Sequence, residues 1–288
     1  MNAIRFSDLA GSLLRRISRW CGAAEISQRR ITRFLGTVGG ETGPLRGGTA
    51  PRTVAVVIPC YGHASFLPAA LTSLAKQSRL PDEIIAVDDH SPDATGTILE
   101  EGFERLRESG GVRCTLLTNE RNRGQAYSLN RAIAAAESEL VMILNDDDYL
   151  LHDAIALMLD LFQRCREVVL IGGTSIHFCG DDQLARLSGT ARPLAGEAAV
   201  PLTVRRPNDV RAYRRYNDLN MTHSGSCFLK SAWQVVGGYC PDKRRRLVPF
   251  SDRDFQLRVN ALYPVAVSTQ VPFSLWRCDS SVDQGRDS

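Results

Sequence analysis

Three consecutive carboxylates, Asp146, Asp147 and Asp148, follow Asn145 and the apolar run 140–144. Adjacent carboxylates form a dense anionic site, and hard divalent cations prefer such oxygen ligands together with substrate phosphates. A calcium-binding EF-hand loop that began at Asp146 would need Gly at its sixth position and Glu at its twelfth, but the chain has Leu at both. A solvated acidic turn that caps the next helix is the alternative, although one cap does not require three acids. We therefore predict that Asp147 and Asp148 bind Mn²⁺ or Mg²⁺.

A second acidic pair, Asp88 and Asp89, follows the apolar run 84–87. Two neighbouring carboxylates repel each other, so keeping both ionised is costly without a partner. A carboxylate at this position can accept hydrogen bonds from the imide N–H of uracil or from ribose hydroxyls. The alternative is an N-cap for the next helix, but Ser91 or Asp93 could serve equally well as that cap. The pair is therefore a candidate nucleotide-binding feature.

The segment 59–63 (PCYGH) follows the apolar run 54–58. Dinucleotide-binding enzymes carry the glycine pattern GxGxxG at such a position. Its absence here argues against a nicotinamide or flavin enzyme. Tyr61 instead offers an aromatic face to a nucleotide base, and a plain proline turn is the alternative.

These polar segments are separated by apolar runs that alternate with amphipathic stretches. We expect strands at 54–58, 84–87, 114–117, 140–144 and 168–171, and helices within 66–74, 98–106, 126–133 and 151–162. Wholly apolar strands that alternate with helices predict an α/β fold with a Rossmann-like, mostly parallel twisted sheet and helices on both faces. Ligands of such sheets bind beyond the carboxyl ends of the strands. We therefore expect Asp89 and Asp147 in one cleft at that edge.

Six segments of the chain together resemble family 2 glycosyltransferases with the GT-A fold. They occur in family order and span roughly residues 54–260. The segments are VVIPCYGHASFLPAALTSLAKQS, IIAVDDHSPDAT, NERNRGQAYSLNRAI, ELVMILNDDDYLLHDAI, HSGSCFLKSAWQVVGGY and VPFSDRDFQLRV. One of them alone is a weak signal, whereas six in sequence are specific. The resemblance implies the GT-A nucleotide-diphospho-sugar transferase fold.

The resemblance also implies a role for each matching position. On the donor side, Pro59 and Tyr61 border the nucleotide base. Asp89 hydrogen-bonds the base, with Asp88 nearby. The diphosphate lies beside the loop that contains Arg123 and Gly124. Asp147 is the metal ligand of the DxD-type motif, and Asp146 reaches the ribose or a metal-bound water. On the acceptor side, the matching residues are His223, Ser224, Gly225 and Ser226.

Asp252 matches the catalytic base of the family. We expect segment 250–259 to begin a helix that has Phe255 and Val259 toward the core and Asp252 in its first turn. Asp254 is the rival, because a helix turns it about 200° away from Asp252. Family position selects Asp252, and helical phase makes Asp254 a surface or salt-bridging residue.

The implied activity is that of an inverting glycosyltransferase. It would move a sugar from a nucleotide-diphosphate sugar, UDP-sugars being favoured, to a hydroxyl of a saccharide or lipid-linked saccharide, in cell-surface polysaccharide or glycolipid synthesis. Asn145 and Ser251 stand where relatives often have acidic residues. The processive signature QxxRW is missing, which favours transfer of one sugar per encounter. The alternatives are an inactive nucleotide-sugar binding protein, or a nucleotidyltransferase, although the latter class usually has a Gly-rich basic loop after its first strand.

The formal net charge of +3 is too small to indicate a nucleic-acid partner, but it is unevenly distributed. Residues 1–50 contain eight Arg and no Lys against three acids, which is +5. Apolar side chains at positions 6, 9, 13, 17 and 20 share one face of a helix, and arginines occupy the other. A basic amphipathic helix of this kind can lie in a membrane interface. We therefore expect peripheral membrane contact through residues 1–35, a helix packed on the body or disorder being the alternatives.

The Gly-, Pro- and Thr-rich stretch 36–52 has the composition of a linker. It divides the basic N-terminal extension, 1–35, from the GT-A catalytic domain, 53–288. Within that domain we place the nucleotide-binding half at about 53–150 and the acceptor-binding half at about 151–288. The region 181–222 shows no clear periodicity.

The eight cysteines form no CxxC pair, so we interpret them as reduced thiols. No apolar run reaches 18 residues, so we expect no membrane-spanning helix. We therefore expect a protein that is cytoplasmic, or attached peripherally to the cytoplasmic face of the membrane. The basic run 243–246 (KRRR) is a solvated loop or a contact for a phosphorylated or lipid-diphosphate acceptor.

Overall fold

The computed structural model describes residues 28–38, 45, 50–190, 200–207, 219 and 221–280. Each strand and helix expected from the apolar runs is present. The strands are β1 (Val54–Cys60), β2 (Glu83–Asp88), β3 (Arg113–Thr118), β4 (Leu140–Ile143) and β6 (Leu170–Gly173). The helices are α3 (Leu67–Ala75), α4 (Thr95–Gly110), α5 (Gln125–Ala135) and α6 (Ala154–Arg164). Uniform burial explains this for four of the strands, because every residue of β1, β2, β4 and β6 is buried, whereas β3 is only partly buried.

The central sheet has the strand order β3-β2-β1-β4-β9-β6-β10-β8. Its first four strands are parallel, and β10 (Val265–Ser268) is parallel to β6. The short strand β9 (Cys227–Leu229) runs antiparallel between β4 and β6, and β8 (Leu202–Arg205) forms an antiparallel edge. The expected mostly parallel sheet is therefore confirmed, with β9 as an insertion that the apolar pattern did not reveal.

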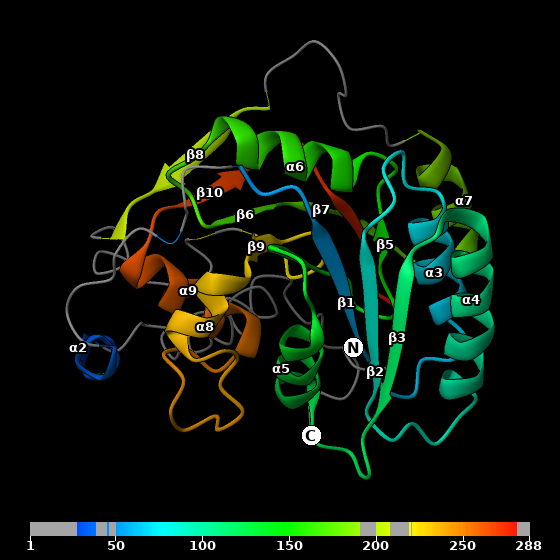
Figure 1. Cartoon of the computed structure of the whole chain (residues 1–288), viewed down its shortest axis with the longest axis horizontal. Coiled ribbons are helices and arrows are strands. Elements are labelled where there is room, and N and C mark those ends of the chain that lie inside the picture. The colour runs from blue at the N-terminus through cyan, green and yellow to red at the C-terminus, as the bar shows by residue number, and fades with distance from the viewer. Residues whose placement is uncertain are drawn as a thin grey trace, which may run out of the picture.

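Helices cover both faces of the sheet. Figure 1 shows α5 on one side of β1, β2 and β3, and α3 with α4 on the other. The helices α8 (Lys230–Val236) and α9 (Ser251–Leu262) pack against each other beside the second half of the sheet. This arrangement leaves the carboxyl ends of β1, β2 and β4 at one edge, where the polar segments emerge.

A second, three-stranded sheet lies beside that edge. It consists of β5 (Tyr149–Leu150), β11 (Ser274–Arg277) and β7 (Ser175–Phe178), in that order, followed along the chain from β7 by α7 (Asp181–Thr190). Strand β5 comes directly after the triple-aspartate segment, and β11 is paired with it. The last described strand of the chain thus supports the acidic turn from behind.

Cys179 and Cys278 form a disulfide, so the expectation that all cysteines are reduced thiols is corrected. The cause is the register of β7 and β11, which run parallel with Phe178 opposite Arg277. The next residue of each strand is a cysteine, and the two Cα atoms lie 5.6 Å apart, within the span of a disulfide. Five further described cysteines are free thiols.

The helix α2 (Gln28–Thr37) packs against α9 instead of standing apart from the body. Ile31 is buried in the core, and an Nη atom of Arg30 donates to the carbonyl of Arg246 at 2.8 Å. Part of the expected extension 1–35 therefore belongs to the folded body. The amphipathic positions between 6 and 20, and most of the expected linker, lie outside the described residues. No helix among the described residues is long and apolar enough to cross a membrane.

Candidate active site

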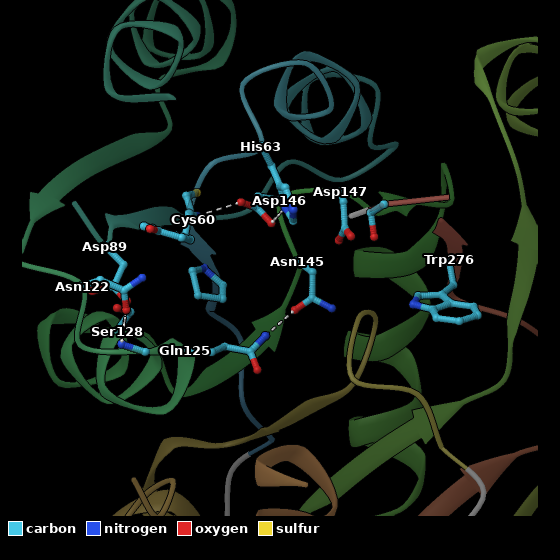
Figure 2. Close-up of a pocket in the computed structure, with 14 residues that line it drawn as sticks. Cys60, His63, Asp89, Asn122, Gln125, Ser128, Asn145, Asp146, Asp147 and Trp276 are labelled. Atoms are coloured by element: carbon cyan, nitrogen blue, oxygen red, sulfur yellow. Dashed lines mark hydrogen bonds and ion pairs between the residues drawn. The ribbon is translucent and has the colours of Figure 1, made fainter. Parts of the chain in front are cut away.

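A cavity of about 320 Å³ lies at the carboxyl ends of β1, β2 and β4. We call this cavity the donor pocket, after the sugar donor that the resemblance leads us to expect there. Fourteen residues line it: Pro59, Cys60, Tyr61, His63, Asp89, Asn122, Gly124, Gln125, Ser128, Asn145, Asp146, Asp147, Trp276 and Ser280. Asp89 and Asp147 share it, which confirms the expected cleft. Figure 2 shows Asp89, Asn122 and Ser128 on one side and His63, Asp146 and Asp147 on the other.

Tyr61 and Pro59 form the part of the donor pocket that follows β1. The tyrosine side chain is 46% exposed, an unusual state for a large aromatic residue. Its N–H donates to Oδ2 of Asp146 at 3.0 Å, which holds the turn after β1 against the turn after β4. An aromatic face is therefore available at the mouth of the pocket for a planar ligand.

Asp89 is 3% exposed and holds the loop that precedes α5. Its Oδ1 accepts from the N–H of Arg123 at 2.8 Å and from Nδ2 of Asn119 at 2.6 Å. Its Oδ2 accepts from the N–H of Gly124 at 2.7 Å. Gly124 has φ of +83° and precedes the first residue of α5, Gln125. Because helix N-termini carry partial positive charge, the loop places an anion-binding helix end at the pocket.

Asp88 and Arg123 do not line the donor pocket. The Oδ1 of Asp88 accepts from the N–H of Ser91 at 2.9 Å, which closes the turn in which His90 takes φ of +63°. The guanidinium of Arg123 lies over the ring of Tyr127, 4.1 Å from its centroid. Asp88 therefore shapes the turn after β2. Arg123 contacts the pocket residue Asp89 through its backbone N–H, and its side chain packs on Tyr127.

His63, Asp146 and Asp147 form a cluster that could hold a metal ion. One potential ligand atom from each residue lies within 4.8 Å of those of the other two. His63 Nδ1 and Asp146 Oδ1 are 2.9 Å apart, and this hydrogen bond is the main cause that raises the pKa of His63. Burial, and then the neighbouring charge of Asp146, raises the pKa of Asp147. Crowded carboxylates of this kind are stabilised by a bound cation, and the donor set suits Mn²⁺ or Mg²⁺.

Asp148, which we predicted as a second metal ligand, turns away from this cluster. Its Oδ1 accepts from the N–H of Arg277 at 3.0 Å, and its Oδ2 accepts from Nδ2 of Asn145 at 3.1 Å and from Oγ of Ser224. Burial, together with the charge of Asp147, raises its pKa to about 8. The carboxyl group of Asp148 is thus engaged in linking the acidic turn to β11 and to the turn before β9.

The predicted acceptor-side residues form that turn before β9 and do not line the donor pocket. His223 Nδ1 lies 3.3 Å from Oδ1 of Asn145, and its Nε2 lies 3.1 Å from the hydroxyl of Tyr239. Ser224 and Ser226 are buried, and Ser226 Oγ donates to the carbonyl of His223. Gly225 has φ of +79°, and a Cβ there would lie 2.9 Å from Phe273 Cβ. The turn is therefore tightly packed, and it contacts Asn145 through His223 and Ser224.

Asp252 lies in the first turn of α9, as expected, with Phe255 and Val259 buried. It is partly exposed and lies outside the donor pocket. Burial lowers the pKa of His223, and the negative charge of Asp252 opposes this shift. Asp254 is fully buried, with its Oδ2 2.9 Å from an Nη atom of Arg258. Asp254 is thus a salt-bridging residue, one of the two states expected for it, whereas the role of Asp252 as the base stays a prediction.

Comparison with known proteins agrees with this geometry. The model of the family described as glycosyl transferase family 2 matches residues 55–233. The chain belongs to this family. The succinoglycan biosynthesis protein ExoO of Rhizobium meliloti is 26% identical over 155 residues, which are 51% of this chain and 42% of ExoO. The matched part of the chain thus spans less than half of that relative.

Solved structures show the same fold. TarS of S. aureus, residues 1–349 with UDP-GlcNAc, has a TM-score of 0.58 at 15% identity over 80% of this chain and 59% of that one. The mannosyltransferase PcManGT of Pyrobaculum calidifontis, with GDP-Man and Mn²⁺, has a TM-score of 0.56 at 19% identity over 86% and 62% of the two chains. This family 2 chain has the GT-A fold.

The sequence of this family 2 chain left two parts of its site unassigned. The segment that holds Trp276, Arg277 and Ser280 could either close over the site or pack in the core or at an edge. His63 was not among the candidate residues, although it lies two residues after Tyr61 at the end of β1. Trp276 and Ser280 come from the far end of the chain, and Ser280 hydrogen-bonds Asp147. Arg277 is 2% exposed, and its guanidinium carbon lies 4.4 Å from the ring centroid of Phe66. Pairing of β11 with β5 and β7 brings these residues to the site, and local sequence does not reveal that pairing.

Proposed function

We propose that this chain is an inverting glycosyltransferase that moves a sugar from a nucleoside-diphosphate sugar to an acceptor hydroxyl. The observation that carries the proposal is the content of the donor pocket. One cavity holds an exposed aromatic face at Tyr61, the N-terminus of α5 at Gln125, and the His63, Asp146 and Asp147 cluster. These features suit a base, a diphosphate and the cation that neutralises it.

The base is proposed to lie beside Pro59 and Tyr61, and the diphosphate near Gly124 and the start of α5. An ionised carboxylate offers about four lone-pair sites. Asp89 uses three of them on Asn119 and the loop, so one remains for a base or ribose donor. We favour a uridine donor, which the complex of TarS with UDP-GlcNAc supports. The complex of PcManGT with GDP-Man makes guanosine the nucleotide to compare.

Mn²⁺ or Mg²⁺ fits the His63, Asp146 and Asp147 donors, and Mn²⁺ is present in the complex of PcManGT. When bound, the cation would neutralise charge that builds on the leaving diphosphate. The protein orients Asp146 independently of any ion, because His63 contacts its Oδ1 and the N–H of Tyr61 donates to its Oδ2. Asp147, hydrogen-bonded by Ser280, completes the set.

Asp252 is the proposed base that takes the proton of the acceptor hydroxyl, and attack opposite the leaving group inverts the anomeric centre. Asp252 lies in the first turn of α9, where the helix dipole favours a negatively charged side chain. His223 and Asn145 link this side to the donor pocket. The acceptor is proposed to be a saccharide or lipid-linked saccharide of cell-surface polysaccharide or glycolipid synthesis, which the likeness to ExoO supports.

The test uses the purified chain with UDP-Glc, UDP-GlcNAc and GDP-Man, in Mn²⁺, in Mg²⁺ and in EDTA. We expect release of nucleoside diphosphate from one donor, dependence on a divalent cation, and loss of release in Asp147→Asn. Asp160→Asn is the matched control, because Asp160 is a partly exposed carboxylate outside the donor pocket that pairs with Arg164 in α6. NMR of the glycosidic product determines whether the anomeric configuration is inverted.

Each alternative predicts a different result. Binding of a nucleotide sugar with no turnover in any metal would identify an inactive binding protein. Release of pyrophosphate instead of nucleoside diphosphate would identify a nucleotidyltransferase. Full activity in EDTA would contradict the proposed cation site.

A further inference from the structure

A second cavity, of about 360 Å³, lies between α2 and the segment that joins α8 to α9. We call it the arginine pocket, and it is lined by Arg30, Arg33, Phe34, Thr37, Val236, Gly237, Tyr239, Cys240, Pro241, Arg244, Arg245, Leu247 and Arg258. Figure 1 shows α2 beside α8 and α9, away from the strands β1, β2 and β3 that end at the donor pocket. The two cavities are lined by different residues.

The lining of the arginine pocket contains five arginines and no acidic residue. Arg258 is neutralised by the buried carboxylate of Asp254. Arg30 donates to a backbone carbonyl and has no ion pair with another described residue. In the described part of the chain, Arg33, Arg244 and Arg245 have no ion pair with another residue. Guanidinium groups gathered around one cavity repel each other, and an anion that bridges them removes that cost.

Hydrogen bonds fix the backbone of segment 240–249, which forms one side of the arginine pocket. Arg246 is buried, and its guanidinium donates to the carbonyls of Cys240 and Pro249 at 2.7 and 2.9 Å. Asp242 accepts from the N–H groups of Arg244 and Arg245 at 2.9 and 3.0 Å. Of the basic run 243–246, Arg246 therefore folds the segment, while Arg244 and Arg245 present their side chains to the cavity.

The arginine pocket adjoins the acceptor side of the protein. Tyr239 lines it, stacks on Phe255 of α9 with ring centroids 4.3 Å apart, and hydrogen-bonds His223 through its hydroxyl. His223 in turn contacts Asn145 of the donor pocket. The charge of Asp252 acts on both His223 and Tyr239. A ligand in the pocket would thus lie on the side of the proposed base, opposite the donor.

We propose that the arginine pocket binds a phosphate or diphosphate group carried by the acceptor, so that the acceptor is a phosphate-linked saccharide. The proposal rests on the transferase function proposed above. Arginine presents a planar fork of donors that matches phosphate oxygens in pairs, which suits a multiply charged oxyanion better than a neutral sugar. Phe34, Val236 and Leu247 add an apolar wall, which can pack an apolar group attached to the phosphate.

The test measures binding of inorganic pyrophosphate by calorimetry in EDTA, which prevents a cation from bridging the ligand to Asp147. The variant Arg33→Gln/Arg244→Gln/Arg245→Gln removes three exposed cations and should keep the fold, which urea unfolding checks. We expect its affinity to fall about 10- to 100-fold or more, because one charge-assisted hydrogen bond corresponds to about that factor. The control Lys76→Gln/Arg105→Gln, at exposed distant positions, should bind as the wild type does.

Vesicles distinguish the source of the phosphate. Phosphatidylcholine vesicles with farnesyl diphosphate should bind the wild type more tightly than the triple variant, which would identify a lipid-linked acceptor, whereas binding of pyrophosphate alone would identify a soluble phosphosugar. If the triple variant loses binding to phosphatidylglycerol vesicles as much as binding to vesicles with farnesyl diphosphate, the arginines form a general membrane-surface patch, and the proposal is overturned. Unchanged pyrophosphate binding in the triple variant, or none in the wild type, would also overturn it. Because these assays require no sugar transfer, absence of donor turnover would count against the proposed function separately.

Discussion

The backbone N–H of Arg277 donates a hydrogen bond to Oδ1 of Asp148 at 3.0 Å, across 129 residues of sequence. The side chain of Arg277 contacts the same turn, since its Nε donates to the carbonyl of Asp147 at 3.3 Å. An Nη atom also pairs with Asp181, the first residue of α7, at 2.9 Å. The guanidinium also lies 4.7 Å from the ring centroid of Phe178. Strand β11 therefore holds the acidic turn in place through one buried arginine.

Arg277→Gln should lower the free energy of unfolding by about 1.5–3 kcal/mol, the usual cost of losing a charged hydrogen bond in the interior. Because the turn loses its support, the Mn²⁺ concentration needed for half-maximal donor turnover should rise as well. Urea unfolding and a Mn²⁺ titration measure the two effects. Arg164→Gln, which breaks the surface pair with Asp160, should change stability by less than about 0.5 kcal/mol. An unchanged Mn²⁺ requirement in Arg277→Gln would limit Arg277 to a role in stability.

His63→Gln should raise the Mn²⁺ concentration required for donor turnover by about 10–100-fold. His63 either ligates the ion or orients Asp146 through the 2.9 Å contact, and loss of such partners typically weakens metal affinity to that extent. His152→Gln is the control, because His152 lies on the surface and outside the donor pocket. Identical Mn²⁺ curves for the wild type and His63→Gln would remove His63 from the proposed site.

Asp252→Asn and Asp254→Asn should fail in different ways. If Asp252 is the base, its replacement should reduce turnover about 10²–10⁴-fold, with donor affinity and unfolding close to normal. Asp254→Asn should instead destabilise the fold by about 3–5 kcal/mol, because it leaves the buried guanidinium of Arg258 without its partner. Steady-state kinetics and urea unfolding separate the two. A stable Asp252→Asn protein with normal transfer would require another base.

Reduction of the Cys179–Cys278 disulfide should lower stability by about 2–4 kcal/mol, because the cross-link closes a long loop of the unfolded chain. Unfolding is measured with and without dithiothreitol. The double variant Cys179→Ser/Cys278→Ser should match the reduced wild type and should not respond to the reductant. Peptide mapping under non-reducing conditions identifies the pair, and two alkylated thiols at these positions would contradict it.

Deletion of residues 1–27 should weaken binding to phosphatidylglycerol vesicles, if the basic amphipathic pattern contacts membranes as predicted. The deletion should end before α2, because Ile31 packs in the core and removal of that helix would damage the body. Sedimentation with vesicles measures binding, and phosphatidylcholine vesicles serve as the control. Unchanged binding after the deletion would refute a membrane role for this segment.

The fold was predictable where burial is uniform along an element. Strands such as β1 and β4 are apolar at every position, so their sequences alone distinguish them from their surroundings. In contrast, β9 has three residues and takes its place through pairing with β4 and β6, both distant in sequence. The disulfide was missed for the same reason, because the register of β7 and β11 is a property of the folded sheet.

The site was predictable by segment but not by atom. Asp146, Asp147 and Asp148 are chemically identical in sequence, and only the path of the turn separates the two that enter the cluster from the one directed at Ser224 and Arg277. The helical phase of α9 was easier, because a fixed rotation per residue separates Asp252 from Asp254. Regular elements thus carry side-chain direction in their sequence, and turns do not.

The insertion of β9 between β4 and β6 has a consequence for biosynthesis. A ribosome delivers the chain from β1 to β4 well before Cys227 emerges. Until then, the unpaired N–H and C=O groups of β4 form an open edge in what becomes the middle of the sheet, and such edges readily pair with other chains. Nascent chains, and fragments that end before β9, are therefore the forms of this protein most exposed to aggregation and most dependent on chaperones.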